Sequence, residues 1–324
     1  MPADQPRQHH YIPQFYLQGF AQDGAKEGRF WVFDKSDGRQ WPSSPKEAAA
    51  ERDFYRVDRD DGGDPFALEK CLQKVEDLLA PVLFETIERR SLPLDRDFDV
   101  LLNLVALTAL RVPALRTFSN HMAAEASRKK LLEALASRDS WEKLTNRMRA
   151  AGIDSPGDPG YEDMKRFVES DDCEITIDMG RNWFADLMIT GSCGLLSHLS
   201  RRRWYLSTVA SGSPDLICSD NPVSLSPTSK SPPGSPTGFA APGTLLLFPL
   251  NRRVVLVGSF EGMMLPPSAP DKTVALVNAA TARNAERFIF SSAPEFVYRD
   301  QANGIRSSRQ LREHIQEQSM KHRE

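Results

Sequence analysis

The chain has 324 residues, of which 40% are hydrophobic and 26% charged, and 41 basic and 44 acidic side chains give a net charge of −3. This composition is typical of a globular protein of one large domain or two lobes. The balance of charge gives no overall electrostatic case for nucleic-acid binding, although a local basic patch stays open. Apolar runs are shorter than the ~18 residues of a membrane-spanning helix, so no membrane partner is expected.

The start of the chain and the cysteines indicate the cellular compartment in which the protein is expected. Residues 1–8 are polar, predict a flexible leader, and lack the apolar core of a secretion signal. The four cysteines, at positions 71, 173, 193 and 218, do not have the spacing of a metal-binding motif. We therefore expect reduced thiols in a bacterial-type cytoplasm.

The N-terminal part predicts strands. The stretch RFWVF, a turn at SDG and residues 39–41 predict a strand, a turn and a returning strand, because aromatic and β-branched residues favour strands. Residues 48–57 predict a further short strand or loop.

The centre predicts helices. Between residues 65 and 90, apolar residues recur at spacings of three and four, and Pro81 is expected to kink or split this helix. A second tract over 97–130 begins with the almost wholly apolar LLNLVALTAL, and a charged amphipathic helix follows over 131–150. The stretch AGIDSPGDPG breaks the pattern, and residues 161–200 predict one or two more helices.

Short strands return after residue 201, around an exposed loop at 226–238, and a helix is expected over 271–287. A helical block over about 65–200 thus lies between N-terminal strands and a C-terminal sheet over about 201–300, which favours the α+β class. We expect the N-terminal strands and this sheet to pair, so that residues 9–300 form a single domain. Residues 301–324 predict a charged peripheral helix or tail.

The segment HHYIPQFYLQGF, residues 9–20, places titratable and aromatic side chains together. His9 and His10 point to opposite faces of an extended chain, so at most one faces a given site. That histidine is either a general base or metal ligand, or part of an ordered terminal strand in which it bonds to a carbonyl.

The segment CSDNPVSL, residues 218–225, turns the chain after a buried strand. Asp220 and Asn221 suit such a turn because their side chains bond to nearby backbone. The alternative is that Asp220 projects into a cleft and Asn221 orients a substrate or a histidine.

Two arginines follow an apolar helical tract. Arg111 lies within LTALRVPALRTF, and Arg116 follows after Pro113. A buried guanidinium needs a charge partner, so Arg111 either clamps an anionic ligand or pairs with Asp220 or Glu51. Residues 201–203 are three arginines before Trp204. We expect them to lie in solvent where a helix meets a strand, and the less favoured alternative is that they bind nucleic acid.

These segments resemble a known family. HHYIPQFYLQGF, FDKSDGR, ERDFY, LRVPALR and CSDNPV together are similar to the family called domain of unknown function 4238, as are FPLNRR at 248–253 and VNAATARNAERFIFSS at 277–292. The resemblance covers nearly the whole chain and implies that these segments share one domain. It implies no fold or activity.

Two functions compete. In the first, one histidine with Asp220, Asn221 and Arg111 forms the catalytic site of a metal-assisted hydrolase or nuclease that acts on phosphate esters, whether nucleic acid or a phosphorylated small molecule. Its candidate residues are His9, His10, Asp220, Asn221 and Arg111 for catalysis, Tyr11 and Arg116 for substrate, and His10 and Asp220 for a divalent metal ion. In the second, the protein is a non-catalytic binding protein, and the His, Arg and Asp side chains form a buried structural network. Satisfied hydrogen bonds would favour the second function.

Overall fold

The computed structural model describes residues 8–57, 63–153, 160–170, 173–232 and 234–321, with backbone alone for 317–321. The expected leader, residues 1–8, therefore lies outside the described residues apart from Gln8. Contacts divide the chain into two compact units, residues 1–114 with 181–324 and residues 115–180. We call these the sheet unit and the helical unit.

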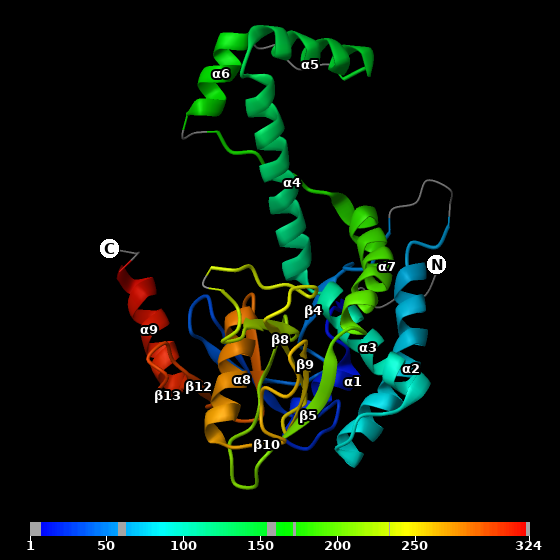
Figure 1. The fold of residues 1–324 in the computed structure, drawn as a ribbon, viewed down its shortest axis with the longest axis vertical. Coiled ribbons are helices and arrows are strands. Elements are labelled where there is room, and N and C mark those ends of the chain that lie inside the picture. Colours follow the sequence, from blue (N-terminus) through cyan, green and yellow to red (C-terminus); the bar gives the residue numbers. More distant parts are fainter. Residues whose placement is uncertain (1–7, 58–62, 154–159, 171–172, 233, 322–324) are drawn as a thin grey trace. The chain divides into compact units, whose positions relative to one another are not determined.

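Two larger sheets form the centre of the sheet unit (Figure 1). The first has five strands in the order β10-β5-β9-β8-β7, antiparallel except for the parallel pair β10 and β5. Its strands are β5 (Arg203–Val209), β7 (Ser224–Pro227), β8 (Thr244–Asn251), β9 (Val254–Ser259) and β10 (Ser268–Ala269).

The second sheet joins distant parts of the chain in the order β3-β2-β11-β6. Its strands are β2 (Phe30–Asp34), β3 (Gln40–Ser43), β6 (Cys218–Ser219) and β11 (Phe288–Ser291). Strands β2 and β11 run antiparallel with Val32 opposite Phe290, and β2 and β3 form the predicted hairpin. The expected pairing between N-terminal strands and the C-terminal sheet is confirmed, as is the α+β class.

Two small strand pairs complete the sheet unit. Strand β1 (Gln8–His10) pairs with β4 (Ala50–Arg52), and β12 (Val297–Arg299) pairs with β13 (Ile305–Ser307). The helices that lie wholly or almost wholly in this unit are α1 (Gln14–Leu17), the 3-10 helix η1 (Gln18–Phe20), α2 (Ala67–Arg89), α3 (Asp95–Leu110), α7 (Gly180–Leu199), α8 (Asp271–Asn284) and α9 (Ser308–Lys321).

Strand β8 is covered on both faces, which explains its continuous run of apolar residues. Leu247 lies in a core cluster with Val274 and Val277 of α8. Phe248 points to the opposite face, as alternation along a strand requires, and stacks on Tyr16 of α1. The opening segment, residues 9–20, therefore packs its helical part, α1 and η1, against the five-stranded sheet, whereas His9 and His10 pair with β4.

The helical unit contains most of α4 (Pro113–Ala134), α5 (Arg138–Ala150) and α6 (Tyr161–Glu169). The side chain of Ser137 caps α5 by accepting a hydrogen bond from the backbone N–H of Ser140 at 3.2 Å. Only Ala124, Leu135 and Val168 are buried among the residues of this unit that the structure describes.

Two helix boundaries differ from the sequence expectation. Helix α2 continues through Pro81, so of the two expected outcomes, a kink or a split, the split does not occur. The tract expected to be one helix over 97–130 is divided at Arg111, because Pro113 starts α4. Within the described residues, no single helix has both the length and the apolar composition to cross a membrane.

Candidate functional site

His9 is a buried acceptor in β1. Its Nδ1 accepts a hydrogen bond from the backbone N–H of Tyr55 at 3.0 Å, so the neutral ring carries its proton on Nε2. The ring stacks on Tyr55 and meets Phe66 edge-on, with centroids 5.8 and 5.9 Å apart. Burial lowers the pKa of His9, which favours this neutral form.

His10 points to the other face of β1, as the alternation of an extended chain predicts. Its Nδ1 lies 3.1 Å from the carbonyl oxygen of Ala48. Its backbone carbonyl accepts hydrogen bonds from the Tyr55 hydroxyl at 3.1 Å and from Nη2 of Arg111 at 3.0 Å. Burial lowers the pKa of His10 as well.

Arg111 joins the opening segment to the helices. It follows α3, its side chain is 2% exposed, and it donates to the carboxylate of Glu76 at 2.7 Å and to the Tyr55 hydroxyl at 2.8 Å. Burial opposes the charged form, but Tyr55 and Glu76 outweigh it and raise the pKa of Arg111. The predicted buried ion pair is confirmed, but its carboxylate is Glu76, and not Asp220 or Glu51.

Asp220 holds a backbone turn. The residue is buried, and its carboxylate accepts hydrogen bonds from the N–H groups of residues 286–288 at 2.7 to 2.8 Å. Desolvation raises its pKa against the effect of these bonds. The backbone carbonyl of Asn221 accepts a hydrogen bond from Nδ2 of Asn284 at 2.7 Å. Neither contact is the expected bond from a side chain to nearby backbone, because Asp220 bonds to backbone 66 to 68 residues later and Asn221 accepts through its own backbone carbonyl.

Tyr11 lies near the Asp220 turn. Its side chain is buried and its ring packs against Phe54, with centroids 5.8 Å apart. Burial raises the pKa of Tyr11, and the nearby carboxylates of Asp220 and Glu51 raise it further. The opening segment and the turn are therefore neighbours, as expected.

The structure thus brings some of the sequence candidates together and separates others. His9, His10 and Arg111 share Tyr55 as a hydrogen-bond partner or ring contact, whereas Asp220 bonds to other residues. Arg116 lies on α4 in the helical unit. In the part of the chain that the structure describes, no group of three or more His, Cys, Asp or Glu side chains could hold a metal ion.

The C-terminal half of the opening segment is fixed to β8 and the turn that follows it. The Tyr16 hydroxyl donates to the carbonyl of Pro249 at 2.6 Å. The carbonyl of Gly19 accepts from the backbone N–H of Arg252 at 3.0 Å. A Cβ atom at Gly19 would lie 2.8 Å from the Cβ of Asn251, so only glycine allows this close approach.

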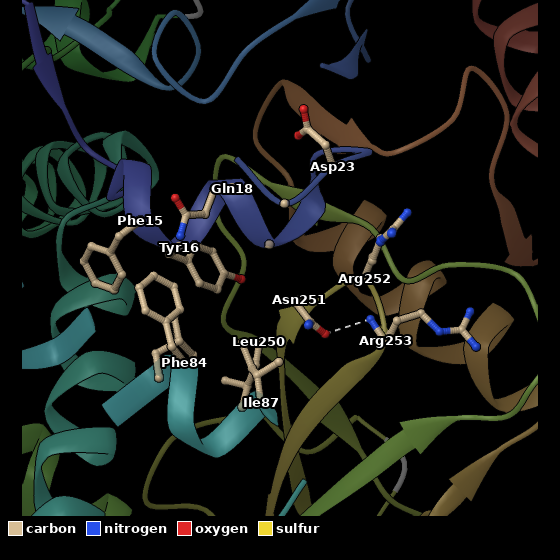
Figure 2. A pocket seen from close by; sticks show the side chains of 13 residues that line it. Phe15, Tyr16, Gln18, Asp23, Phe84, Ile87, Leu250, Asn251, Arg252 and Arg253 are labelled. Atoms are coloured by element: carbon tan, nitrogen blue, oxygen red, sulfur yellow. Dashed lines mark hydrogen bonds between the residues drawn. The ribbon is translucent and has the colours of Figure 1, made fainter. Parts of the chain in front are cut away.

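The turn between β8 and β9 gives each residue of Asn251-Arg252-Arg253 a separate role. The Asn251 side-chain oxygen accepts from the backbone N–H groups of Arg253 and Val254, which closes the turn (Figure 2). Arg253 donates to the Asp215 carboxylate at 3.0 Å and to three backbone carbonyls. The guanidinium of Arg252 lies 3.6 Å from Asp215 and donates no hydrogen bond to any described residue.

A cavity of about 330 Å³ opens between the opening segment, α2 and this turn, and we call it the opening-segment cavity (Figure 2). Its walls are mainly apolar, and Figure 2 shows the rings of Phe15 and Phe84 on one side and the turn with Arg252 on the other. The residues that line it are Phe15, Tyr16, Gln18, Gly19, Asp23, Gly24, Leu83, Phe84, Ile87, Leu250, Asn251, Arg252 and Arg253.

A larger cavity of about 860 Å³, also mainly apolar, lies among α2, α3 and α7, with Leu72, Leu107 and Ile189 in its wall. Val57 and Asp64 also line it, and the segment between them includes residues 58–62, which are outside the described residues. The opening-segment cavity is the better candidate site because the opening segment and the turn at 251–253 both line it.

The fold and the site define an α+β protein that has buried polar networks along its opening segment and an apolar cavity beside them. The chain belongs to the family described as "Protein of unknown function (DUF4238)", whose model matches residues 8–295. No curated protein and no solved structure matches the chain. Residues 9–20 and 248–253, two of the segments that carried the resemblance, meet at the opening-segment cavity together with α2.

Sequence reasoning missed three residues that matter here. Glu76 lies beside Leu72 and Val75 on the apolar side of α2, and a carboxylate in that position signals a buried partner. Tyr55 shows no sign in the sequence of the hydrogen bonds that its hydroxyl makes with Arg111 and the carbonyl of His10. Arg252 stands in a turn between two apolar strands, and the sequence does not show that it and Arg253 both form ion pairs with Asp215, at 3.6 and 3.0 Å.

Proposed function

We propose that this protein is a non-catalytic binding protein and that the opening-segment cavity is its ligand site. One observation carries the proposal. Two family motifs, held together by buried hydrogen bonds, enclose a mainly apolar cavity, and Arg252 at its edge keeps unused hydrogen-bond donors. Small-molecule sites have this composition, with a few polar groups in an apolar wall.

The cavity suits an amphipathic carboxylate. Phe15, Phe84 and Leu83 offer apolar contact to a hydrocarbon body. A guanidinium binds a carboxylate through two parallel hydrogen bonds. Arg252 forms an ion pair with Asp215 at 3.6 Å that includes no hydrogen bond, so its N–H donors can still bind a ligand carboxylate. We therefore favour medium-chain acyl or aryl carboxylates as ligands.

The polar network supports the same proposal. The Nδ1 atoms of His9 and His10, the guanidinium of Arg111 and the carboxylate of Asp220 all have hydrogen-bond partners within the protein. Satisfied buried groups are typical of a structural network, whereas a catalytic site needs groups free to meet a substrate.

Binding is tested by titrating octanoate and its neutral analogue octanamide in a calorimeter. We expect Arg252→Gln to weaken octanoate binding by about tenfold and to leave octanamide unchanged, because only the carboxylate uses the guanidinium. Phe84→Ala should weaken both ligands. Arg39→Gln, at an exposed arginine paired with Asp37, is the control and should change neither. If neither ligand binds, or if Arg252→Gln weakens both equally, the proposal is wrong.

The metal-assisted hydrolase or nuclease stays a prediction from the sequence. It is tested by phosphodiesterase and nuclease assays with added divalent metal on the wild type, His9→Ala, His10→Ala and Asp220→Ala. A metal-dependent activity that disappears in these variants while they stay folded would favour the enzyme over the binding protein.

A further inference from the structure

Helix α4 exposes a continuous stripe in the helical unit. Phe118, Met122, Glu125, Lys129 and Leu132 follow one another at spacings of four, three, four and three residues. At ~100° per residue these positions fall within about 80° of one another on the helix surface. All five are exposed, and the three apolar side chains are 60%, 50% and 42% exposed. This spacing is that of a helix packed against another helix.

The helical unit does not bury these side chains itself. Its only buried side chains among the described residues are Ala124, Leu135 and Val168. Glu125 and Lys129 form no ion pair with any residue that the structure describes, although they are four residues apart on one helix. The stripe thus presents both apolar area and unpaired charge to a partner.

The stripe of one copy complements the stripe of a second copy when the two helices run antiparallel. In an antiparallel pair of α4 helices with Met122 opposite Leu132 of a second copy, Glu125 falls opposite Lys129 of that copy. A two-fold axis repeats both contacts, so two ion pairs are flanked by two apolar contacts. A parallel pair in register would place each charge opposite its own copy, and like charges repel. Moving the antiparallel register by seven residues would place Met122 opposite Glu125 in one direction and Lys129 opposite Leu132 in the other.

We propose that two copies of this chain dimerise through antiparallel pairing of α4 along the stripe from Phe118 to Leu132. The partner is a second copy because the charge order fits itself in this pairing. The interface is independent of the ligand site proposed above, since its residues all lie in the helical unit.

Charge reversal tests the pairing by sedimentation equilibrium over a series of concentrations. The wild type should dimerise. Glu125→Lys and Lys129→Glu should each weaken the dimer by at least about tenfold, because each creates two like-charged contacts across the axis. The double variant should restore dimerisation. An equimolar mixture of the two single variants should also form dimers, because each chain then meets the opposite charge.

Both positions are exposed, so the variants should fold, and far-ultraviolet circular dichroism checks this. The mixture of the two single variants is a second control, because it restores opposite charges without any further substitution. A wild type that stays monomeric up to about 0.5 mM would overturn the proposal. The proposal would also be wrong if the single charge reversals left the dimer as stable as in the wild type. It would be wrong as well if they weakened the dimer but neither the double variant nor the mixture restored it.

Discussion

Removing the Arg111 side chain should destabilise the protein strongly. Arg111→Ala deletes the hydrogen bonds to Glu76, to the Tyr55 hydroxyl and to the carbonyl of His10. Loss of one member of a buried ion pair costs about 3–5 kcal/mol, because the other charge is left without compensation. Glu76 is 25% exposed and can regain some hydration, so we expect the lower part of this range.

The measurement is the urea dependence of unfolding, followed by circular dichroism. Arg111→Lys provides a milder variant that keeps the charge and loses the contact with the Tyr55 hydroxyl, and it should fall between the wild type and Arg111→Ala. Arg39→Ala removes an exposed pair with Asp37 and should change stability by less than about 0.5 kcal/mol. If Arg111→Ala costs less than about 1 kcal/mol, the network is not structural and the catalytic interpretation gains support.

Two further predictions concern the opening segment. Burial lowers the pKa of His9, so the wild type should lose stability as the pH falls below the ordinary histidine value of about 6.5. The variant His9→Asn keeps an acceptor for the Tyr55 N–H but does not titrate, so its stability should decline less over this range. Urea midpoints at about pH 8 and about pH 5 measure the difference, and equal declines would contradict the argument. Gly19→Ala should lower stability by about 1–3 kcal/mol because its Cβ meets Asn251 at 2.8 Å, whereas Gly194→Ala, with open space around it, should cost nothing in a thermal melt. Equal melting temperatures for these two variants would exclude the close packing at Gly19.

Local patterns were enough to predict most elements. The three-and-four spacing of apolar residues over 65–90 became α2, and the hairpin around the SDG turn became β2 and β3. The predicted pairing of N-terminal strands with the C-terminal sheet is realised by β2 and β11, although the sequence did not single out these two strands. The class and the joining of N-terminal strands to the C-terminal sheet were therefore predictable.

The details of the site depended on tertiary contacts that no local pattern carries. The need of Arg111 for a carboxylate was predictable from its apolar surroundings, but the choice of Glu76 depends on how α2 packs against α3. Asp220 accepts three backbone hydrogen bonds from a segment 66 to 68 residues later in the chain, and only the folded structure brings that segment to it. Helix α2 tolerates Pro81 because its neighbours hold it in place, which a propensity alone cannot show.

The sheet that contains both β2 and β11 has a consequence for synthesis on the ribosome. The hairpin at Phe30–Ser43 leaves the ribosome well before its partner strand, Phe288–Ser291, has been synthesised. Until then the inner edge of β2 has unpaired N–H and C=O groups, which favour association with other chains. A polypeptide that stops before residue 288 would keep this exposed edge, so it should depend on chaperones until β11 has been made.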